Sequence, residues 1–205
     1  MYFPHLSSRV LIGICLLGAL VSFVSGGILY ARFQGNMRTL SERLNTLGPL
    51  KVHAIADGDT LSVLPRFGKP RTVRLLGINT PEIAHPGLRI KEECHGQEAR
   101  DFVRKIAQGR YATLEYDSAK GMFEDKGRLL AYVFIYESYL GAVFGFGSID
   151  LNKHLLEVGL AEEWLYKGSY RRADEFLAAE TAAREAGIGA WASCPDFKRH
   201  PRSKR

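Results

Sequence analysis

The stretch from Leu50 to Ile78, LKVHAIADGDTLSVLPRFGKPRTVRLLGI, decides the fold that this sequence predicts. Apolar and polar residues alternate along it and many side chains are β-branched, a pattern typical of strands with one buried face. Asp-Gly and Gly-Lys-Pro combinations interrupt the alternation at two places where tight turns form readily. The stretch therefore predicts a meander of three consecutive strands, Leu50–Ala56, Thr60–Pro65 and Thr72–Ile78.

The sequence after the meander changes between helical and strand patterns. Apolar residues recur at helical spacing from Ala99 to Ile106, which predicts an amphipathic helix that ends before Gly109. The stretch Tyr139–Ile149, YLGAVFGFGSI, mixes aromatic residues with glycine and predicts an added hairpin or loop. Five strands, with one helix inserted and two helices after them, fit an α+β, mainly β, barrel of the OB type. The elements expected after the meander are a helix at Gly96–Ala107, strands at Tyr111–Tyr116 and Arg128–Tyr136, and helices at Asp150–Val158 and Arg171–Ala186.

The composition limits the class of protein and of partner. The 205 residues suit one domain of ordinary size together with a separate segment. The formal net charge of +6 and the pI near 9.3 fit a polyanionic partner, either a nucleic acid or an anionic lipid surface. The three cysteines include no pair with CxxC spacing, which argues against a structural zinc site and against a disulfide-rich scaffold.

An uncharged apolar segment lies near the N-terminus. From Val10 to Tyr30 it reads VLIGICLLGALVSFVSGGILY, which is long enough to cross a hydrocarbon core of roughly 30 Å. We expect residues 10–30 to form a single-pass transmembrane helix or signal anchor; a cleaved signal peptide, with Arg9 as its charged flank, is the alternative. The remaining parts would be an N-terminal flank at 1–9, a juxtamembrane linker at 31–48 with helical spacing, the OB-type domain at 49–196 and a basic tail at 197–205.

Two observations disagree about the side of the membrane on which the domain lies. Three arginines closely follow the apolar segment and one precedes it, which favours a cytoplasmic domain. Cys94 and Cys194 lie at opposite ends of the domain, and a disulfide between them would close a loop of about 100 residues in an oxidising compartment. We expect the domain outside the cytoplasm. Secretion after signal cleavage is an alternative placement, and two buried free thiols are the alternative for the cysteines.

Three short clusters carry the residue types that phosphodiester hydrolysis needs: metal ligands, cations for phosphate oxygens, and a group that orients water. The first, Asp57 to Thr60 (DGDT), has two carboxylates beside the glycine of a tight turn. The second, Val73 to Glu82 (VRLLGINTPE), has an arginine on a strand, followed by a polar turn that contains proline. The third, Lys126 to Tyr132 (KGRLLAY), has an arginine at a strand start. A hairpin turn or a buried ion pair would explain a single cluster equally well.

In this order and spacing, the three clusters resemble the staphylococcal nuclease family, and the resemblance runs from about Leu50 to Trp191. Similar supporting motifs are GQEA (Gly96–Ala99), GLA (Gly159–Ala161) and GIGAW (Gly187–Trp191). The resemblance implies a five-stranded OB barrel with three helices, a Ca²⁺ cofactor, and endonucleolytic cleavage of DNA and RNA.

The resemblance also assigns roles to single residues. Asp59 matches a metal-ligand aspartate, and Thr80 matches a residue whose main-chain carbonyl binds the metal. Glu82 matches the glutamate that orients or deprotonates the attacking water. Arg74 and Arg128 match two guanidinium groups on the scissile phosphate, a role that suits a planar donor of two hydrogen bonds.

The sequence departs from the family pattern at three places. Asn79 stands where well-known members have a second aspartate ligand, so we expect weaker Ca²⁺ binding through its carbonyl oxygen. Lys126 replaces a tyrosine before the Gly-Arg pair and would meet a phosphate as a point charge. Trp164 lies near the position of a substrate-stacking tyrosine, and we expect it and Tyr166 to contact nucleic acid; core packing is the alternative for Trp164. Asp57 is expected to be a turn residue.

The sequence therefore predicts a membrane-held, calcium-dependent nuclease that acts on DNA and RNA without an obligate protein partner. The alternative is a membrane-tethered OB module that binds nucleic acid without cutting it. The joint presence of Asp59, Arg74, Glu82 and Arg128 favours catalysis, because a binding module has no need of that set.

Overall fold

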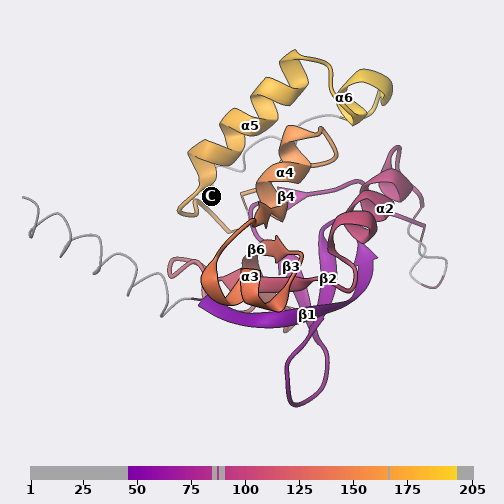
Figure 1. Cartoon of the computed structure of the whole chain (residues 1–205). Coiled ribbons are helices and arrows are strands. Elements are labelled where there is room, and N and C mark those ends of the chain that lie inside the picture. Colours follow the sequence, from indigo (N-terminus) through magenta and orange to yellow (C-terminus); the bar gives the residue numbers. More distant parts are fainter. Residues whose placement is uncertain (1–45, 85–86, 88–90, 166, 198–205) are drawn as a thin grey trace, which may run out of the picture. The chain divides into compact units, whose positions relative to one another are not determined.

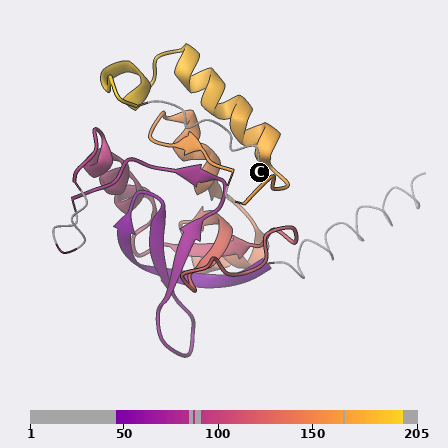
Figure 2. The ribbon, with the colours of Figure 1, turned by 180° about the vertical axis from the view of Figure 1, so that it is seen from behind.

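The computed structural model describes residues 46–84, 87, 91–165 and 167–197 (Figure 1; Figure 2 gives the view from behind). The predicted membrane segment at 10–30, linker residues 31–45 and tail residues 198–205 lie outside this part. Within the described residues, no helix is both long enough and apolar enough to cross a membrane.

Strands come first along the described chain, and helices gather toward its end (Figure 1). The elements are β1 (Thr46–Asp57), β2 (Thr60–Leu64), β3 (Arg71–Leu75), β4 (Ile78–Asn79), α2 (Gly96–Ala107), β5 (Tyr111–Glu115), β6 (Leu129–Tyr136), α3 (Tyr139–Phe144), β7 (Ile149–Asp150), α4 (Leu151–Glu157), β8 (Glu162–Glu163), α5 (Ala173–Glu185) and α6 (Ala190–Ser193).

The long strand β1 serves two neighbours. Its first half pairs antiparallel with β5 and its second half with β2, and the change of partner falls at Lys51, which is opposite both Leu64 and Tyr111. Irregular register on both sides of Lys51 marks the bulges that bend the strand. One strand thereby joins the two halves of the sheet.

The sheet closes on itself between β3 and β6. The strand order is β3-β2-β1-β5-β6-β7, and β3 also pairs in parallel with β6, so that Val73 lies opposite Leu129 and Leu75 opposite Ala131. The five strands β1, β2, β3, β5 and β6 form a closed barrel, which confirms the OB-type barrel predicted from the sequence. The short strands β4 and β8 pair separately, with Asn79 opposite Glu162.

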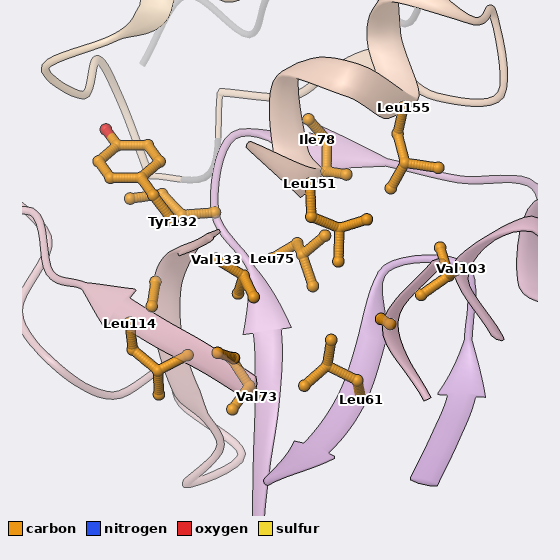
Figure 3. Packing of buried hydrophobic residues seen from close by; sticks show 14 of the residues in the cluster. Leu61, Val73, Leu75, Ile78, Val103, Leu114, Tyr132, Val133, Leu151 and Leu155 are labelled. Atoms are coloured by element: carbon orange, nitrogen blue, oxygen red, sulfur yellow. The ribbon is translucent and has the colours of Figure 1, made fainter. Parts of the chain in front are cut away.

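Apolar side chains from the strands fill the barrel, and α2 and α4 pack against them (Figure 3). Burial of each such leucine or valine contributes roughly 1.5–3 kcal/mol, so this cluster is the main source of stability. The residues seen in the close-up include Leu61, Val73, Leu75, Leu114 and Val133 from the strands, Val103 from α2, and Leu151 and Leu155 from α4.

A buried amide joins α4 to the closing strands. Asn152 is fully buried, its Oδ1 accepts a hydrogen bond of 2.9 Å from Val133 N, and its Nδ2 donates to Leu76 O at 2.8 Å and to Ala131 O at 3.3 Å. One side chain thus satisfies backbone groups on β6 and just after β3, where the chain turns toward the second cluster.

The last three residues of the linker predicted at 31–48 belong to a strand. Strand β1 begins at Thr46, so the predicted helical spacing up to Gly48 is wrong for these last residues. Leu47 pairs with Leu114 and Thr46 with Glu115, because β5 offers an open edge for backbone hydrogen bonds that local apolar spacing does not reveal.

The prediction of a hairpin or loop at Tyr139–Ile149 is also wrong in part. Residues 139–144 form the short helix α3, whose N-cap is Ser138 with its Oγ accepting 3.0 Å from Gly141 N. Gly145, at φ 77°, ends the helix. The serine cap and the C-terminal glycine are ordinary helix signals that the density of glycines obscured. With α6, this helix adds to the three that the sequence predicts.

We expect Asn152→Ala to lower the free energy of unfolding by about 2–4 kcal/mol, because it leaves the Val133 N–H and the Leu76 carbonyl without this partner, whereas Ala131 O still accepts from Leu76 N. Urea denaturation of the full-length protein measures the change. Lys153→Ala, on the partly exposed neighbour, is the matched control and should cost less than about 1 kcal/mol. An Asn152→Ala variant as stable as the parent would contradict the role assigned to this amide.

Candidate active site

Residues from all three clusters line one cleft of about 620 Å³ at the end of the barrel where β1 meets β2. The β1–β2 turn, the end of β3, the turn after β4 and the loop before β6 all contribute to its wall. Its polar and aromatic lining residues are Asp57, Asp59, Thr60, Arg74, Asn79, Glu82, Glu124, Asp125, Lys126, Arg128 and Trp164.

The β1–β2 turn presents Asp59 to the cleft. Asp59 is nearly buried; its Oδ1 accepts 2.9 Å from Thr60 Oγ1 and its Oδ2 accepts 3.3 Å from Thr80 N. A Cβ on Gly58 would lie 2.7 Å from Thr80 Oγ1 and 2.9 Å from the Ala99 Cβ. Only glycine allows the turn to approach Thr80 and α2 so closely.

Arg74 ties this turn to the second cluster. Its guanidinium forms an ion pair with the Asp59 carboxylate and donates 3.4 Å to the Asp59 main-chain oxygen. It also donates 3.0 Å to Asn79 Oδ1. Arg74 therefore fixes Asp59 and Asn79 on the same side of the cleft.

Asn79 is oriented by the groups on its two sides. Its Oδ1 accepts from Arg74, and its Nδ2 donates 3.3 Å to Glu162 Oε1. Because a guanidinium only donates and a carboxylate only accepts, an amide satisfies both neighbours in one orientation. An aspartate at position 79 would instead place a second carboxylate against the buried Glu162.

Glu82 lies half-buried beside the first cluster. Burial raises the pKa of its carboxyl group from 4.5 to about 7, with help from a hydrogen bond to Asp57 and from the charges of Asp57 and Asp59, while Arg74 opposes the shift. Three carboxylates thus share one small volume. Asp57, which the sequence suggested as a turn residue only, is part of this group.

Arg128 is held beside the first cluster by Glu124 and Thr60. The Arg128 and Glu124 side chains form an ion pair that raises the pKa of Arg128, and an Arg128 terminal nitrogen donates 3.3 Å to Thr60 Oγ1. Glu124 and Gly127 form a turn in which Gly127 N donates 2.9 Å to Glu124 O. The sequence did not identify Glu124 as a site residue. It lies in a loop four residues before Arg128, and no motif marks it.

The structure describes two of the three residues that were predicted to contact nucleic acid. Lys126 is exposed and Trp164 is partly exposed, and both line the cleft. Trp164 is fixed by its backbone N, which donates 3.0 Å to Gly77 O. Tyr166 lies outside the described residues, so its role stays a prediction.

Comparison with known proteins identifies the group to which this arrangement belongs. Residues 72–193, more than half of the chain, match the family described as "Staphylococcal nuclease homologue". The chain is a member of the staphylococcal nuclease family. The resemblance that the three clusters suggested is thereby confirmed, although the match begins after Asp57 and Asp59.

Individual relatives agree with this membership of the staphylococcal nuclease family. An uncharacterized protein of Bacillus anthracis is 38% identical over 69% of this chain, which spans 59% of that relative. An uncharacterized protein of Methanocaldococcus jannaschii is 31% identical over 69% of this chain and 70% of its own length. The thermonuclease of Staphylococcus intermedius is 28% identical over 68% of this chain and 74% of its own length.

The pairing of Asn79 with Glu162 predicts a coupling between them. Asn79→Asp should destabilise the metal-free protein, because it places a second carboxylate against a buried one, whereas the same substitution in a Glu162→Gln background should be tolerated. Urea denaturation of the two single variants and the double variant should give a coupling free energy of about 1–3 kcal/mol. Additive effects would show that Glu162 does not determine the residue at position 79.

Proposed function

We propose that this chain is a metal-dependent endonuclease that hydrolyses phosphodiester bonds of DNA and RNA by attack of water. The observation that supports this most directly is that Asp59, Arg74, Glu82 and Arg128, from separate stretches of the sequence, line one cleft. A module that only binds nucleic acid does not need a carboxylate with a pKa near neutrality between two arginines.

The arginines would hold the phosphate. A guanidinium has five N–H donors. The described contacts comprise three on Arg74, to Asp59 and Asn79, and two on Arg128, to Glu124 and Thr60. Donors remain on both groups for nonbridging oxygens, and the fixed guanidinium groups would stabilise the charge that develops there in the transition state.

Glu82 would accept the proton of the attacking water. Without a bound cation, burial and the neighbouring carboxylates raise the pKa of Glu82 to about 7, so its carboxylate is a stronger base than that of an exposed glutamate. Asp57 contributes indirectly, since its hydrogen bond and charge are among the causes that raise the pKa of Glu82.

The site suits a calcium ion by the chemistry of its donors. Asp59, the Thr80 main-chain oxygen and the neighbouring Asp57 carboxylate are hard oxygen donors of the kind that Ca²⁺ prefers. Burial raises the pKa of Glu82, the neighbouring Asp57 and Asp59 raise it further, and a divalent cation bound here would offset the repulsion among these carboxylates. When bound, the ion would polarise a phosphoryl oxygen and acidify a water. Asn79 Oδ1 is engaged by Arg74, so a direct Asn79 ligand stays a prediction.

Digestion of single- and double-stranded DNA and RNA by the full-length protein in detergent tests the proposal. We expect cleavage with Ca²⁺ and none with chelator. Glu82→Gln and Arg128→Ala should each lower kcat by about 10²–10³-fold, while Lys105→Ala, on the exposed face of α2, should not. Cleavage in chelator, or by Glu82→Gln at the parent's rate, would contradict the mechanism. Binding without cleavage would support the alternative module.

We further propose that residues 10–30 hold the protein to a membrane with the nuclease domain outside the cytoplasm. Support comes from the length of the uncharged segment and from a disulfide in the domain.

Spheroplasts of a bacterial host that expresses the full chain test this placement. The protein should resist extraction by carbonate, and added protease should degrade the domain without lysis. A domain that is protected until lysis would contradict the orientation, and a shortened protein in the medium would show that the segment is cleaved.

A further inference from the structure

The main chain of Glu82 is held by Glu93, eleven positions later. Glu82 N donates a hydrogen bond of 3.0 Å to Glu93 Oε2, and Glu93 N donates 2.9 Å to Glu82 O. The chain that leaves the cleft after Glu82 therefore returns to it just before α2. Both contacts act on the backbone that carries the proposed general base.

The start of α2 presses against the same backbone. Gly96 N donates 3.0 Å to Glu93 O, and a Cβ on Gly96 would lie 2.3 Å from Glu82 O. A residue with a side chain would therefore displace Glu82, so glycine at this position permits the close approach.

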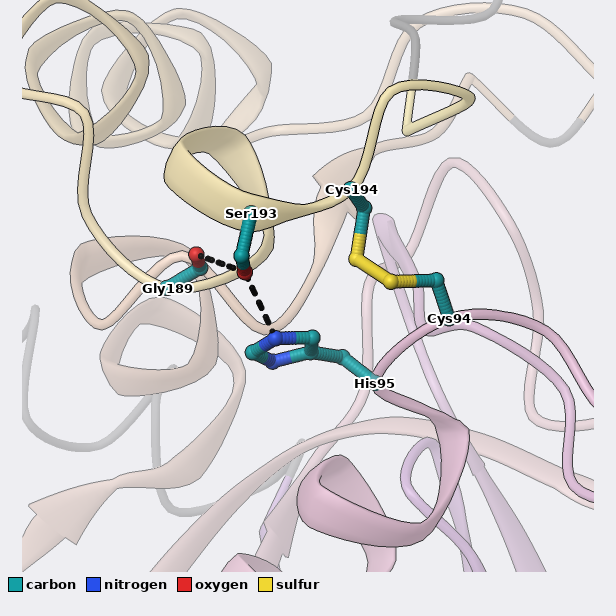
Figure 4. Close-up of a disulfide and its surroundings, with 5 residues drawn as sticks. All are labelled: Cys94, His95, Gly189, Ser193 and Cys194. Carbon is teal, nitrogen blue, oxygen red and sulfur yellow. Dashed lines mark hydrogen bonds between the residues drawn. A yellow bond between two sulfur atoms is a disulfide. The ribbon is translucent and has the colours of Figure 1, made fainter.

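A covalent bond fixes the residue next to Glu93. Cys94 forms a disulfide with Cys194, at a Cα–Cα distance of 5.8 Å (Figure 4). Beside it, Ser193 Oγ and His95 Nε2 form a 2.8 Å hydrogen bond. Cys94 is exposed, so a reductant in solution can reach it.

The other end of the disulfide is anchored to the body of the domain. Cys194 N donates 2.9 Å to Ala190 O, and Ala190 N donates 2.9 Å to Gly159 O at the end of α4. Backbone hydrogen bonds therefore fix α6 to the residues just after α4. The disulfide in turn fixes Cys94, the neighbour of Glu93, to the end of α6.

We propose that Glu93 and the Cys94–Cys194 disulfide are a positioning device for Glu82, so that nuclease activity depends on the oxidised state of the protein. The inference rests on the proposed function. In the switching step, a dithiol reductant gives two electrons and two protons to the disulfide; the S–S bond breaks, two thiols form, and the reductant becomes a disulfide. Such a nuclease stays weak in the reducing cytoplasm and gains activity where disulfides form.

We expect loss of the positioning device to lower kcat and to leave substrate binding nearly unchanged. The arginines that would hold the phosphate lie on β3 and just before β6, and their hydrogen bonds and ion pairs among the described residues are to Asp59, Asn79, Glu124 and Thr60. A misplacement of about 1 Å at a reacting group can cost about 10²-fold in rate. Reduction is therefore expected to lower kcat about 10–100-fold while KM changes less than about twofold.

Steady-state cleavage of a short oligonucleotide by the full-length protein in detergent, with and without dithiothreitol, tests the proposal. The Cys94→Ser/Cys194→Ser variant should show the low kcat of the reduced parent and no response to reductant, whereas Cys15→Ser should respond like the parent. Glu93→Ala should also lower kcat. Glu93→Gln, which keeps an oxygen to accept from Glu82 N, should restore most of it, and the exposed neighbour variant Glu92→Ala is the matched control.

The variant Phe176→Leu distinguishes a general loss of stability from a loss of positioning. It changes a buried residue of α5 in the hydrophobic core. At a temperature where all variants are folded by near-ultraviolet circular dichroism, Phe176→Leu should retain kcat. A reduced parent that cuts at the oxidised rate, or Glu93→Gln as slow as Glu93→Ala, overturns the positioning device and leaves the proposed function intact. A parent that cuts no better than Glu82→Gln in either state overturns both.

Discussion

The candidate site depends on the parallel pairing of β3 with β6. Arg74 is on β3 opposite Leu130, and Arg128 immediately precedes β6. Without this pairing the two guanidinium groups would lie toward opposite ends of an open sheet. Closure of the barrel brings them to one cleft, and Asn152 reinforces the closure by joining α4 to the backbone of both closing segments.

The cleft contains two arginine–carboxylate ion pairs and, beside them, further carboxylates. Arg74 is paired with Asp59 and Arg128 with Glu124, so each arginine already has an acidic partner that holds it in place. Asp57 and Glu82 place two further carboxylates beside Asp59, and burial together with these neighbours raises the pKa of Glu82. The neutral Asn79 limits the negative charge on the side where Glu162 is buried. A polyanionic substrate and a cation would thus meet a site whose charges are arranged to receive both.

Much of this arrangement could be predicted from the sequence. Alternation, one Asp-Gly turn and one Gly-Lys-Pro turn located the meander, and an apolar stripe located α2 at its observed bounds. The family resemblance carried by the three clusters also named Asp59, Arg74, Glu82 and Arg128, and the structure brings these four residues to one cleft. Glu162 could not be found in this way, because it meets Asn79 across 83 positions through the small β4–β8 ladder. The start of β1 was missed for the same reason, since its partner β5 comes much later in the chain.

The late arrival of β6 has a consequence for biosynthesis. A growing chain presents β1, β2 and β3 first, together with Asp59, Arg74 and Glu82, yet β3 has no second partner until Leu129–Tyr136 has been made. Pairings between distant segments form slowly, and open strand edges are exposed meanwhile. A nascent or prematurely ended chain therefore carries most of the acidic half of the site without the arginine that completes it. Assembly of the barrel and assembly of the cleft are one event.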